Sequence, residues 1–199
     1  MTREKTYDRT YFDTWYRKAG IGSRARLRRK VALAVATAEY HLERPIRTVL
    51  DIGCGEGAWR APLLELRPKA HYLGFDSSEY AIRRYGARRN LHFARFADFA
   101  MLRPCPPADL VICSDVLHYV PTRELVRGLP GLAALCGGVA FIEIFAKEDE
   151  TEGDNVGFQP RSAKFYRERF AALGLRQIGS YCWLSSALIE HAAAMEIAD

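Results

Sequence analysis

The chain has 199 residues, of which 49% are hydrophobic and 27% are charged. This ordinary globular mixture is long enough to bury a substantial core in a single domain. No apolar run approaches the roughly 18 residues that span a membrane, and the first ten residues lack the apolar segment of a secretory signal. We therefore expect a cytoplasmic protein with no membrane partner. The five cysteines are scattered without a C-x-x-C pair, which predicts reduced thiols and no zinc site.

The net charge is +5 and the isoelectric point is about 9.0. The excess of basic residues gathers between Arg17 and Lys30. Such a run would attract an acidic ligand or a nucleic acid. The alternative, which we favour, is the solvated face of a helix, because no aromatic-studded nucleic-acid module accompanies the charges.

Helical and strand patterns alternate along the chain, which predicts an α/β fold with a mainly parallel sheet and helices on both of its faces. We expect helices over 7–18, from the N-cap Ser23 to Pro45, and over 59–66, 80–89, 123–136 and 163–173. The expected strands are 48–52, 71–75, 91–96, 110–113, 139–145 and 175–184. The polar segment 147–160 predicts a loop beside the site. The segment 187–197 fits either a helix or a closing strand.

A glycine-rich motif follows the first expected strand. Residues 49–57 read Val-Leu-Asp-Ile-Gly-Cys-Gly-Glu-Gly. A strand that ends in Gly53, Gly55 and Gly57 leaves bare backbone at the carboxyl edge of the sheet, where nucleoside ligands dock. Glycine allows this close approach and the unusual φ/ψ values of the turn.

The pattern D-x-G-x-G-x-G, which begins at Asp51, resembles the first motif of class I S-adenosylmethionine (SAM)-dependent methyltransferases. Two alternatives remain at this point: a dinucleotide-binding loop, since Gly53, Gly55 and Ala58 satisfy G-x-G-x-x-G/A, and a tight turn without a ligand. Asp51 favours SAM, because a carboxylate beneath the ligand suits a cationic ammonium and sulfonium better than a pyrophosphate.

Acidic residues also end the next two expected strands. Asp76 ends the second, and a carboxylate there accepts hydrogen bonds from both hydroxyls of a ribose. Alternatively, Asp76 or Ser77 is only the N-cap of the following helix. Asp98 follows the third strand, where it would accept from an adenine amino group with Phe99 packed nearby.

The fourth strand ends in Ser114 and Asp115, and His118 and Tyr119 come just after. With these four stretches in order, residues 45–145 resemble class I methyltransferases. The resemblance implies one domain, with an N-terminal helical cap over 1–44 and a Rossmann-like core over 45–199. It implies SAM as cofactor and S-adenosylhomocysteine (SAH) as product. The implied cofactor-binding residues are Asp51, Gly53, Cys54, Gly55, Gly57, Asp76, Ser77, Asp98, Phe99, Ser114 and Asp115.

Departures from other branches of this family narrow the chemistry. Residues 113–116 read Cys-Ser-Asp-Val, unlike the D/N-P-P-Y/F of amino-methylating nucleic-acid enzymes. Cys105 precedes the fourth strand, so it does not match the nucleophile of base C5-methylation. No metal-ligand spacing accompanies the site. These features favour a small-molecule acceptor over a nucleic acid. The basic run is compatible with an acidic acceptor.

The expected reaction is an in-line displacement, in which an acceptor O, N or C attacks the sulfonium methyl. His118 is the first candidate base because its unperturbed pKa lies near neutrality; alternatively, it is a hydrogen-bonded histidine at a helix start. Glu143 is the second candidate, unless it pairs with an arginine. Tyr11, Trp15, Tyr16 and Tyr119 are the expected acceptor-binding residues. The first three could instead form a small core within the cap.

Other functions remain open from the sequence: an RNA or protein methyltransferase that uses the basic cap, a SAM- or nucleotide-binding module without turnover, and an NAD-dependent oxidoreductase.

Overall fold

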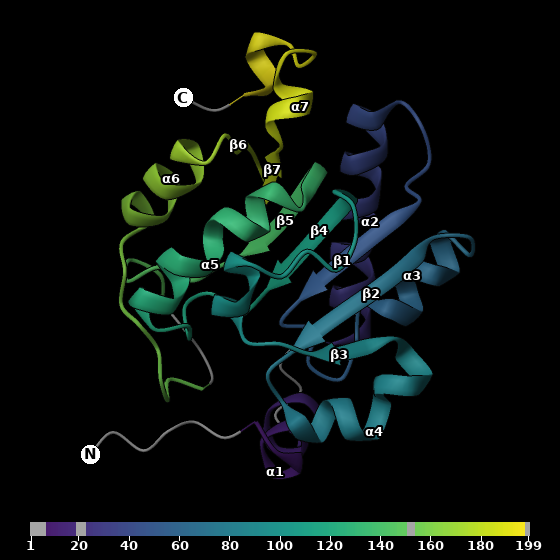
Figure 1. Cartoon of the computed structure of the whole chain (residues 1–199), viewed down its shortest axis with the longest axis vertical. Coiled ribbons are helices and arrows are strands. Elements are labelled where there is room, and N and C mark those ends of the chain that lie inside the picture. The colour runs from purple at the N-terminus through teal and green to yellow at the C-terminus, as the bar shows by residue number, and fades with distance from the viewer. Residues whose placement is uncertain (1–6, 19–22, 151–153, 198–199) are drawn as a thin grey trace.

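A computed structural model describes residues 7–18, 23–150 and 154–197 of the chain. Its centre is a seven-stranded sheet of order β3-β2-β1-β4-β5-β7-β6, with helices on both faces (Figure 1). The strands β1 to β5 are parallel, and β7 is antiparallel to its neighbours β5 and β6. This confirms the predicted fold class. The strands are β1 (Thr48–Ile52), β2 (His71–Asp76), β3 (Leu91–Phe93), β4 (Ala108–Ser114), β5 (Cys136–Glu143), β6 (Arg176–Gly179) and β7 (Cys182–Leu184).

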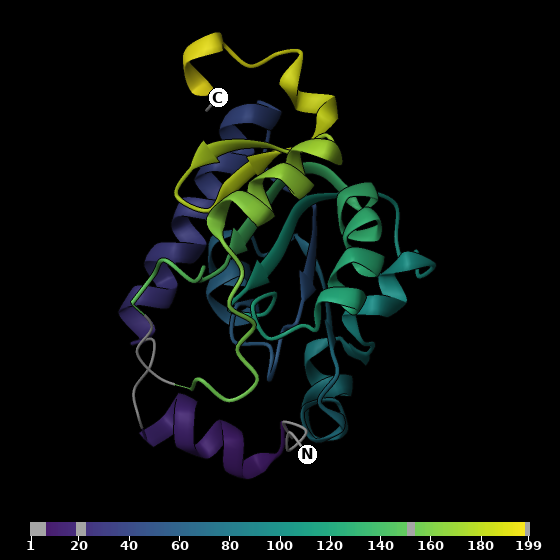
Figure 2. The same cartoon turned by 90° about the vertical axis from the view of Figure 1, so that its left-hand side faces the viewer.

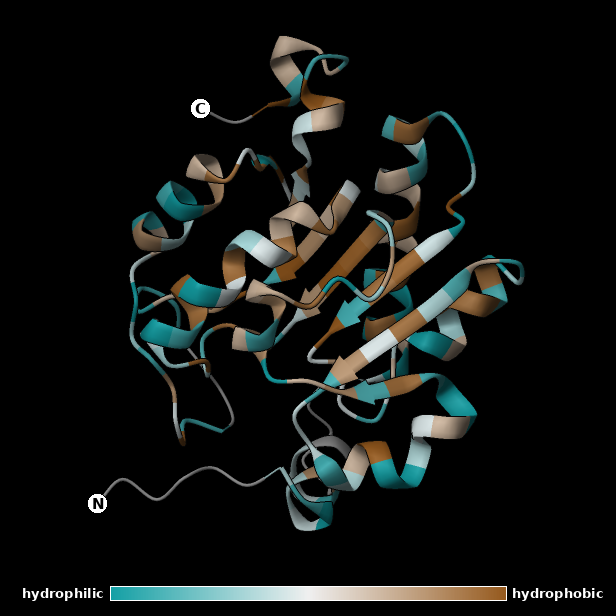
Figure 3. Cartoon of the chain, in the orientation of Figure 1, coloured by the Kyte–Doolittle hydropathy of each residue, from teal (hydrophilic) through white to brown (hydrophobic). Residues whose placement is uncertain are grey.

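The sheet separates two layers of core. In β1, Val49 packs with the helices α2 (Arg24–Leu42) and α3 (Arg60–Leu66), whereas Leu50 packs on the opposite face with α5 (Thr122–Ala134) and α6 (Ala163–Ala172). Both residues are buried because helices cover both faces of a parallel sheet. Apolar colour accordingly runs along β4 and β5 in Figure 3.

Side-chain caps fix the helix starts that position the site. Ser23 accepts a hydrogen bond from the backbone N–H of Arg26 and begins α2, as predicted. Ser78 does the same for α4 (Glu79–Arg89). The N-terminal segment forms α1 (Arg9–Phe12) and continues as a π-helix, Asp13–Lys18. Figure 2 shows this segment crossing the carboxyl edge of the sheet. No helix in the described ranges is long and apolar enough to cross a membrane.

The predicted third strand, 91–96, is too long. The strand β3 ends at Phe93, and Phe96–Ala100 forms a 3₁₀ helix. Phe96 and Phe99 lie three residues apart and enter the same core, which suits a helical turn and not a strand.

The predicted single strand 175–184 is wrong, because the segment is the hairpin of β6 and β7. The chain reverses at Ser180 and Tyr181, whose φ values are 49° and 64°. These left-handed conformations favour glycine or asparagine, so the residues at the turn gave no hairpin signal. The ambiguous segment 187–197 contains helical turns, α7 (Ser186–Ile189) and the 3₁₀ helix Ala194–Glu196.

Two glycines let α5 approach the 3₁₀ helix that carries Asp98. A Cβ atom on Gly128 would lie 2.3 Å from the carbonyl oxygen of Phe96, and one on Gly131 would lie 1.7 Å from that of Phe99. Because backbone cannot yield as a flexible side chain does, these positions require glycine. The position of Asp98 therefore depends on the glycine face of α5.

We expect Gly131→Ala to displace the 3₁₀ helix and to lower the free energy of unfolding by about 1–3 kcal/mol, the usual cost of overpacking. Urea unfolding measures this loss. The control is Arg127→Ala, because Arg127 is exposed on the same helix and should change stability by less than about 0.5 kcal/mol. Equal stability of the two variants would contradict the close-packing argument.

Candidate active site

The turn between β1 and α3 has the backbone that its glycines allow. Gly53, Gly55 and Gly57 have φ values of 77°, 54° and 76°, all in the left-handed region. The turn is tied to β2 by the Gly53 N–H, which donates to the Phe75 carbonyl oxygen at 2.7 Å. Cys54 is buried beneath it. The sequence therefore folds here into a half-buried rim of bare backbone at the carboxyl edge of the sheet.

Asp76 connects this rim to the end of β2. Its carboxylate accepts hydrogen bonds from the backbone N–H groups of Gly55 and Ser78, both at 2.7 Å. The N-cap of α4 is Ser78, which accepts from the Ala81 N–H, so neither Asp76 nor the exposed Ser77 is the cap. Burial raises the pKa of Asp76, and these backbone hydrogen bonds oppose the rise. Asp76 is thus placed against the glycine turn, where the ribose role puts it.

Asp51 supports the turn from below. Its side chain is only 2% exposed and accepts a hydrogen bond of 2.5 Å from the Tyr72 hydroxyl. Burial raises the pKa of Asp51 to about 7, the Tyr72 hydrogen bond opposes the rise, and the nearby charge of Asp76 adds to it. Asp51 therefore sits in the interior beneath the rim.

The 3₁₀ helix after β3 orients Asp98 and Phe99 differently. Asp98 is exposed, and one carboxylate oxygen accepts from the Arg95 N–H at 2.8 Å. Phe99 is 1% exposed and meets the Phe75 ring edge-to-face, with the ring centroids 5.6 Å apart. Phe99 therefore packs in the core beside the exposed Asp98, its carbonyl oxygen accepts from Arg103, and contact of its backbone with an adenine stays a prediction.

Glu143, at the end of β5, has both carboxylate oxygens engaged. Lys30 of α2 donates to one at 2.5 Å, and the Ser114 hydroxyl donates to the other at 2.6 Å. The side chain of Glu143 is 2% exposed. Glu143 pairs with a lysine instead of the arginine considered from the sequence. The contact ties α2 to the edge of the sheet beside β4.

His118 and Asp115 form a second pair just past β4. Nε2 of His118 lies 3.1 Å from Oδ1 of Asp115, and Nδ1 accepts from the Phe145 N–H at 3.4 Å. His118 is 1% exposed, whereas the Asp115 side chain is 37% exposed. Asp115 has a φ of 63°, a strained conformation that is concentrated at functional sites. This arrangement fits the alternative of a hydrogen-bonded histidine and leaves Asp115 as the accessible member of the pair.

The N-terminal helix packs over the glycine turn. A Cβ atom on Gly55 would lie 3.2 Å from the Phe12 ring, and Phe12 stacks on Tyr80 of α4. The backbone carbonyl of Tyr7 accepts from the Ser78 hydroxyl at 2.5 Å. Trp15 is half-buried. These contacts place the first helical segment of the predicted cap at the site.

The other predicted acceptor residues differ in what the structure describes. Tyr11 meets Tyr7 and Phe12 edge-to-face, which fits a small core within the cap. The side chain of Tyr16 lies outside the described residues. Tyr119 is half-buried and its hydroxyl donates to the Asp154 carbonyl oxygen at 2.7 Å, which links the turn after β4 to the loop after β5.

Several residues at this edge were missed from the sequence. Tyr7 lies among carboxylates, since burial and the charges of Asp76, Asp154 and Asp115 raise its pKa. The Phe158 ring packs against His118 at 5.6 Å. No local motif marks these residues. Phe158 lies in the polar loop 147–160, which was expected beside the site, whereas nothing in the sequence singled out Tyr7.

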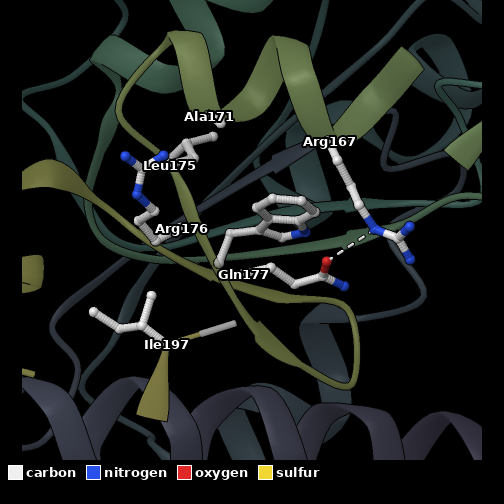
Figure 4. A pocket seen from close by; sticks show the side chains of 7 residues that line it. Arg167, Ala171, Leu175, Arg176, Gln177 and Ile197 are labelled. Carbon is white, nitrogen blue, oxygen red and sulfur yellow. Dashed lines mark hydrogen bonds between the residues drawn. The ribbon is translucent and has the colours of Figure 1, made fainter. Parts of the chain in front are cut away.

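A cavity of about 500 Å³ lies elsewhere, among side chains of α6, the β6–β7 hairpin and Ile197 (Figure 4). Its lining residues, which include Arg167, Gln177 and Trp183, all come from α6 and the chain after it. It is therefore separate from the glycine turn. Within the described ranges, no group of three or more His, Cys, Asp or Glu side chains could hold a metal ion.

Comparisons with known proteins agree with this geometry. A family model described as a methyltransferase domain matches residues 50–139. Trans-aconitate 2-methyltransferase of Azoarcus sp. (strain BH72) is 30% identical over 158 residues, which are 75% of this chain and 58% of that protein. The chain belongs to the class I SAM-dependent methyltransferase family.

Solved structures of methyltransferases share the fold. A sugar N-methyltransferase from Streptoalloteichus sp ATCC 53650 superposes with a TM-score of 0.65 at 18% identity, covering 87% of this chain and 92% of that one. A SAM-bound amino pentose methyltransferase from Micromonospora echinaspora gives 0.64 at 16% identity, covering 91% and 98%. The chain spans about half the length, or less, of the curated relatives it matches. The predicted family, whose cofactor is SAM, is confirmed.

Two buried aspartates should respond to pH with opposite signs. Between pH values of about 4 and 7 the folded protein keeps a proton on Asp51 that the unfolded chain releases, so stability falls as pH rises through that window. Asp51→Asn removes this loss while Asn can still accept from Tyr72. We expect the variant to exceed the wild type at pH 8 by on the order of 2 kcal/mol, and to match it near pH 4, in urea unfolding.

Asp109 is the matched control. Burial raises its pKa, but hydrogen bonds from Arg44 and from the N–H groups of Arg47 and Thr48 lower it below the usual value. Its stabilisation is therefore present above pH 4 and lost in acid. We expect Asp109→Asn to destabilise the protein at pH 8. The same sign for both variants at pH 8 would refute the assignment of the two environments.

Proposed function

We propose that this protein transfers the methyl group of SAM to an O, N or C atom of a small-molecule acceptor. The observation that carries the proposal is the unit of Asp76 and the left-handed glycine turn at the carboxyl edge, with its carboxylate already hydrogen-bonded to the Gly55 N–H. A dinucleotide-binding function has less support, because the carboxyl group of the buried Asp51 beneath the turn would repel the negative charge of a pyrophosphate.

The residues divide the cofactor between them. The turn from Gly53 to Gly57 admits the methionine part, Asp76 and Ser77 take the ribose hydroxyls, and Asp98 with the Phe99 backbone takes the adenine. Ser114 and Asp115 border the ammonium and the reacting methyl. When bound, SAM supplies the activated methyl group, and the protein supplies alignment and removal of water.

The acceptor side is formed by segments around the turn after β4. Asp115, its neighbour His118, and Tyr119 face the edge where the methyl group would lie. We propose that Asp115 contacts the acceptor and that His118 orients the Asp115 side chain. His118 is assigned this indirect role because its Nδ1 already accepts a backbone hydrogen bond and its ring is buried. Glu143 acts through its contact with Lys30, which holds α2 at the site.

The named relatives suggest the first acceptor to assay. Curated proteins that match this chain carry the name trans-aconitate 2-methyltransferase, so trans-aconitate is the starting candidate for this small molecule. The basic run gives less support to a nucleic acid, because Arg28 pairs with Glu65 on α3 and Lys30 with Glu143. These pairs fit the helix-face interpretation.

Titration calorimetry tests the cofactor. We expect SAM and SAH to bind in the micromolar range, about −8 kcal/mol, and NAD to bind far more weakly. Asp76→Asn should weaken SAM at least tenfold through loss of charge-assisted hydrogen bonds of about 1.5–3 kcal/mol each. Glu79→Gln, one turn away on the exposed face of α4, is the control and should bind as the wild type does. Preferential binding of NAD would contradict the proposed use of SAM.

Turnover tests the pair after β4. We expect Asp115→Asn to lower kcat by about 10²–10⁴-fold, and His118→Asn to lower it less. If His118 acts through Asp115, the double variant should be no slower than Asp115→Asn alone, because residues that act as a unit are not additive. Measurements of kcat at saturating SAM, with the first acceptor found, check this. Multiplicative losses would show that His118 acts independently, as a base or otherwise.

A further inference from the structure

Arg161 is a buried cation whose hydrogen bonds go to neutral oxygens. Arg161 is only 7% exposed. One terminal nitrogen donates to the Leu117 carbonyl oxygen and to the Tyr166 hydroxyl, both at 3.0 Å; the other donates to the Val120 carbonyl oxygen. Nε donates to the Thr122 hydroxyl at 3.1 Å. These bonds direct the guanidinium fork at the turn after β4, at the first residue of α5 and at α6.

No carboxylate pairs with Arg161 among the described residues. Burying a charge without a counter-ion is costly, so its hydrogen bonds must be well formed to offset the lost hydration. A lysine cannot replace it, because one ammonium group cannot reach oxygens on both sides of a turn. The geometry of the fork, rather than its charge alone, is what this site uses.

The two carbonyls that Arg161 holds bracket the residues of interest. Leu117 precedes His118 and Val120 follows Tyr119. Within the turn, the Tyr119 N–H donates to the Val116 carbonyl oxygen at 2.9 Å and the Val120 N–H donates to the Leu117 carbonyl oxygen at 3.3 Å, and Arg161 adds hydrogen bonds from outside the turn. Fixing both carbonyls therefore fixes the direction in which His118 leaves the backbone.

The backbone around Arg161 completes the enclosure of His118. The Gln159 N–H donates to the His118 carbonyl oxygen at 2.8 Å, and the Arg161 carbonyl accepts from the Lys147 N–H at 2.8 Å. The rings of Phe145 and Phe158 lie 5.4 and 5.6 Å from the imidazole. Arg161 thus joins the loop after β5 to the turn after β4.

We propose that Arg161 is a positioning residue, which sets the orientation of His118 and hence of Asp115 at the acceptor edge. That Arg161 positions His118 follows from the contacts above. That this positioning matters for turnover rests on the proposed methyl transfer. Most of the proposed cofactor residues, namely the glycine turn, Asp76 and Asp98, follow β1, β2 and β3 on the other side of β4, so Arg161 should affect the acceptor step far more than SAM binding.

Nuclear magnetic resonance of the free protein tests the positioning directly. Protein carrying ¹³C at Cε1 of its five histidines gives one signal per imidazole, and His118→Asn identifies that of His118. In the wild type this signal is displaced by the neighbouring rings, since the Tyr119 ring is 4.3 Å away and two more are close. We expect Arg161→Gln to move it toward the position of an exposed histidine while the other four signals stay.

Arg169→Gln is the matched control. Arg169 lies on α6, packs 3.5 Å over the Phe165 ring and donates to a backbone carbonyl, but none of its bonds reaches the turn after β4. It should leave the His118 signal in place. If Arg161→Gln fails to fold, Arg161→Lys decides, and its His118 signal should also move. An unmoved His118 signal in the folded Arg161 variants would overturn the proposal.

Binding and turnover then separate this proposal from the proposed function. With Arg161→Lys we expect a SAM dissociation constant within about twofold of the wild type and a kcat lowered at least tenfold, because small misplacements of a reacting group are costly. Failure of the wild type to bind SAM would refute the methyltransferase function and leave the His118 result standing. An unchanged kcat would show that positioning by Arg161 does not contribute to turnover.

Discussion

The site depends on a backbone that must be left-handed and bare at the end of β1. Gly53, Gly55 and Gly57 supply this conformation, and the Asp76 carboxylate holds it through the Gly55 N–H. A side chain at Gly55 would meet Phe12 of the N-terminal helix. The turn therefore also sets how closely the cap approaches, so one glycine-rich segment shapes both the proposed cofactor surface and its cover.

Electrostatics at this edge favour a cationic ligand. Asp51 is buried and Asp76 is half-buried, desolvation raises the pKa of both, and the partners described for them are neutral donors. Two such carboxylates lower the stability of the empty protein near neutral pH. A ligand that brings a sulfonium and an ammonium would relieve this repulsion, whereas a pyrophosphate would increase it. Under the proposed function, the same charges that weaken the empty fold would favour SAM over a dinucleotide.

Local signals made much of this structure predictable. The strand β1 was expected over the residues it occupies, because an apolar run ended at glycine, and Ser23 was expected as the cap of α2. Long-range contacts gave no such signal. Lys30 and Glu143 lie 113 residues apart in the chain, and Arg161 meets the carbonyls of residues about 40 positions earlier. Every residue has a backbone carbonyl, so no sequence motif marks the carbonyls to which a distant arginine binds.

The two halves of the site differ in how the family constrains them. The methyltransferase match covers residues 50–139, which include the glycine turn, Asp76, Asp98 and the turn after β4. Phe12, Lys30, Glu143 and Arg161 lie outside it. The family model therefore covers most of the proposed cofactor residues and the turn after β4, whereas the cap and the loop after β5 lie outside it. A relative's name accordingly supports the cofactor more than the acceptor, and under the proposed function the residues of the cap and of the loop after β5 are the first to vary when the choice of acceptor is tested.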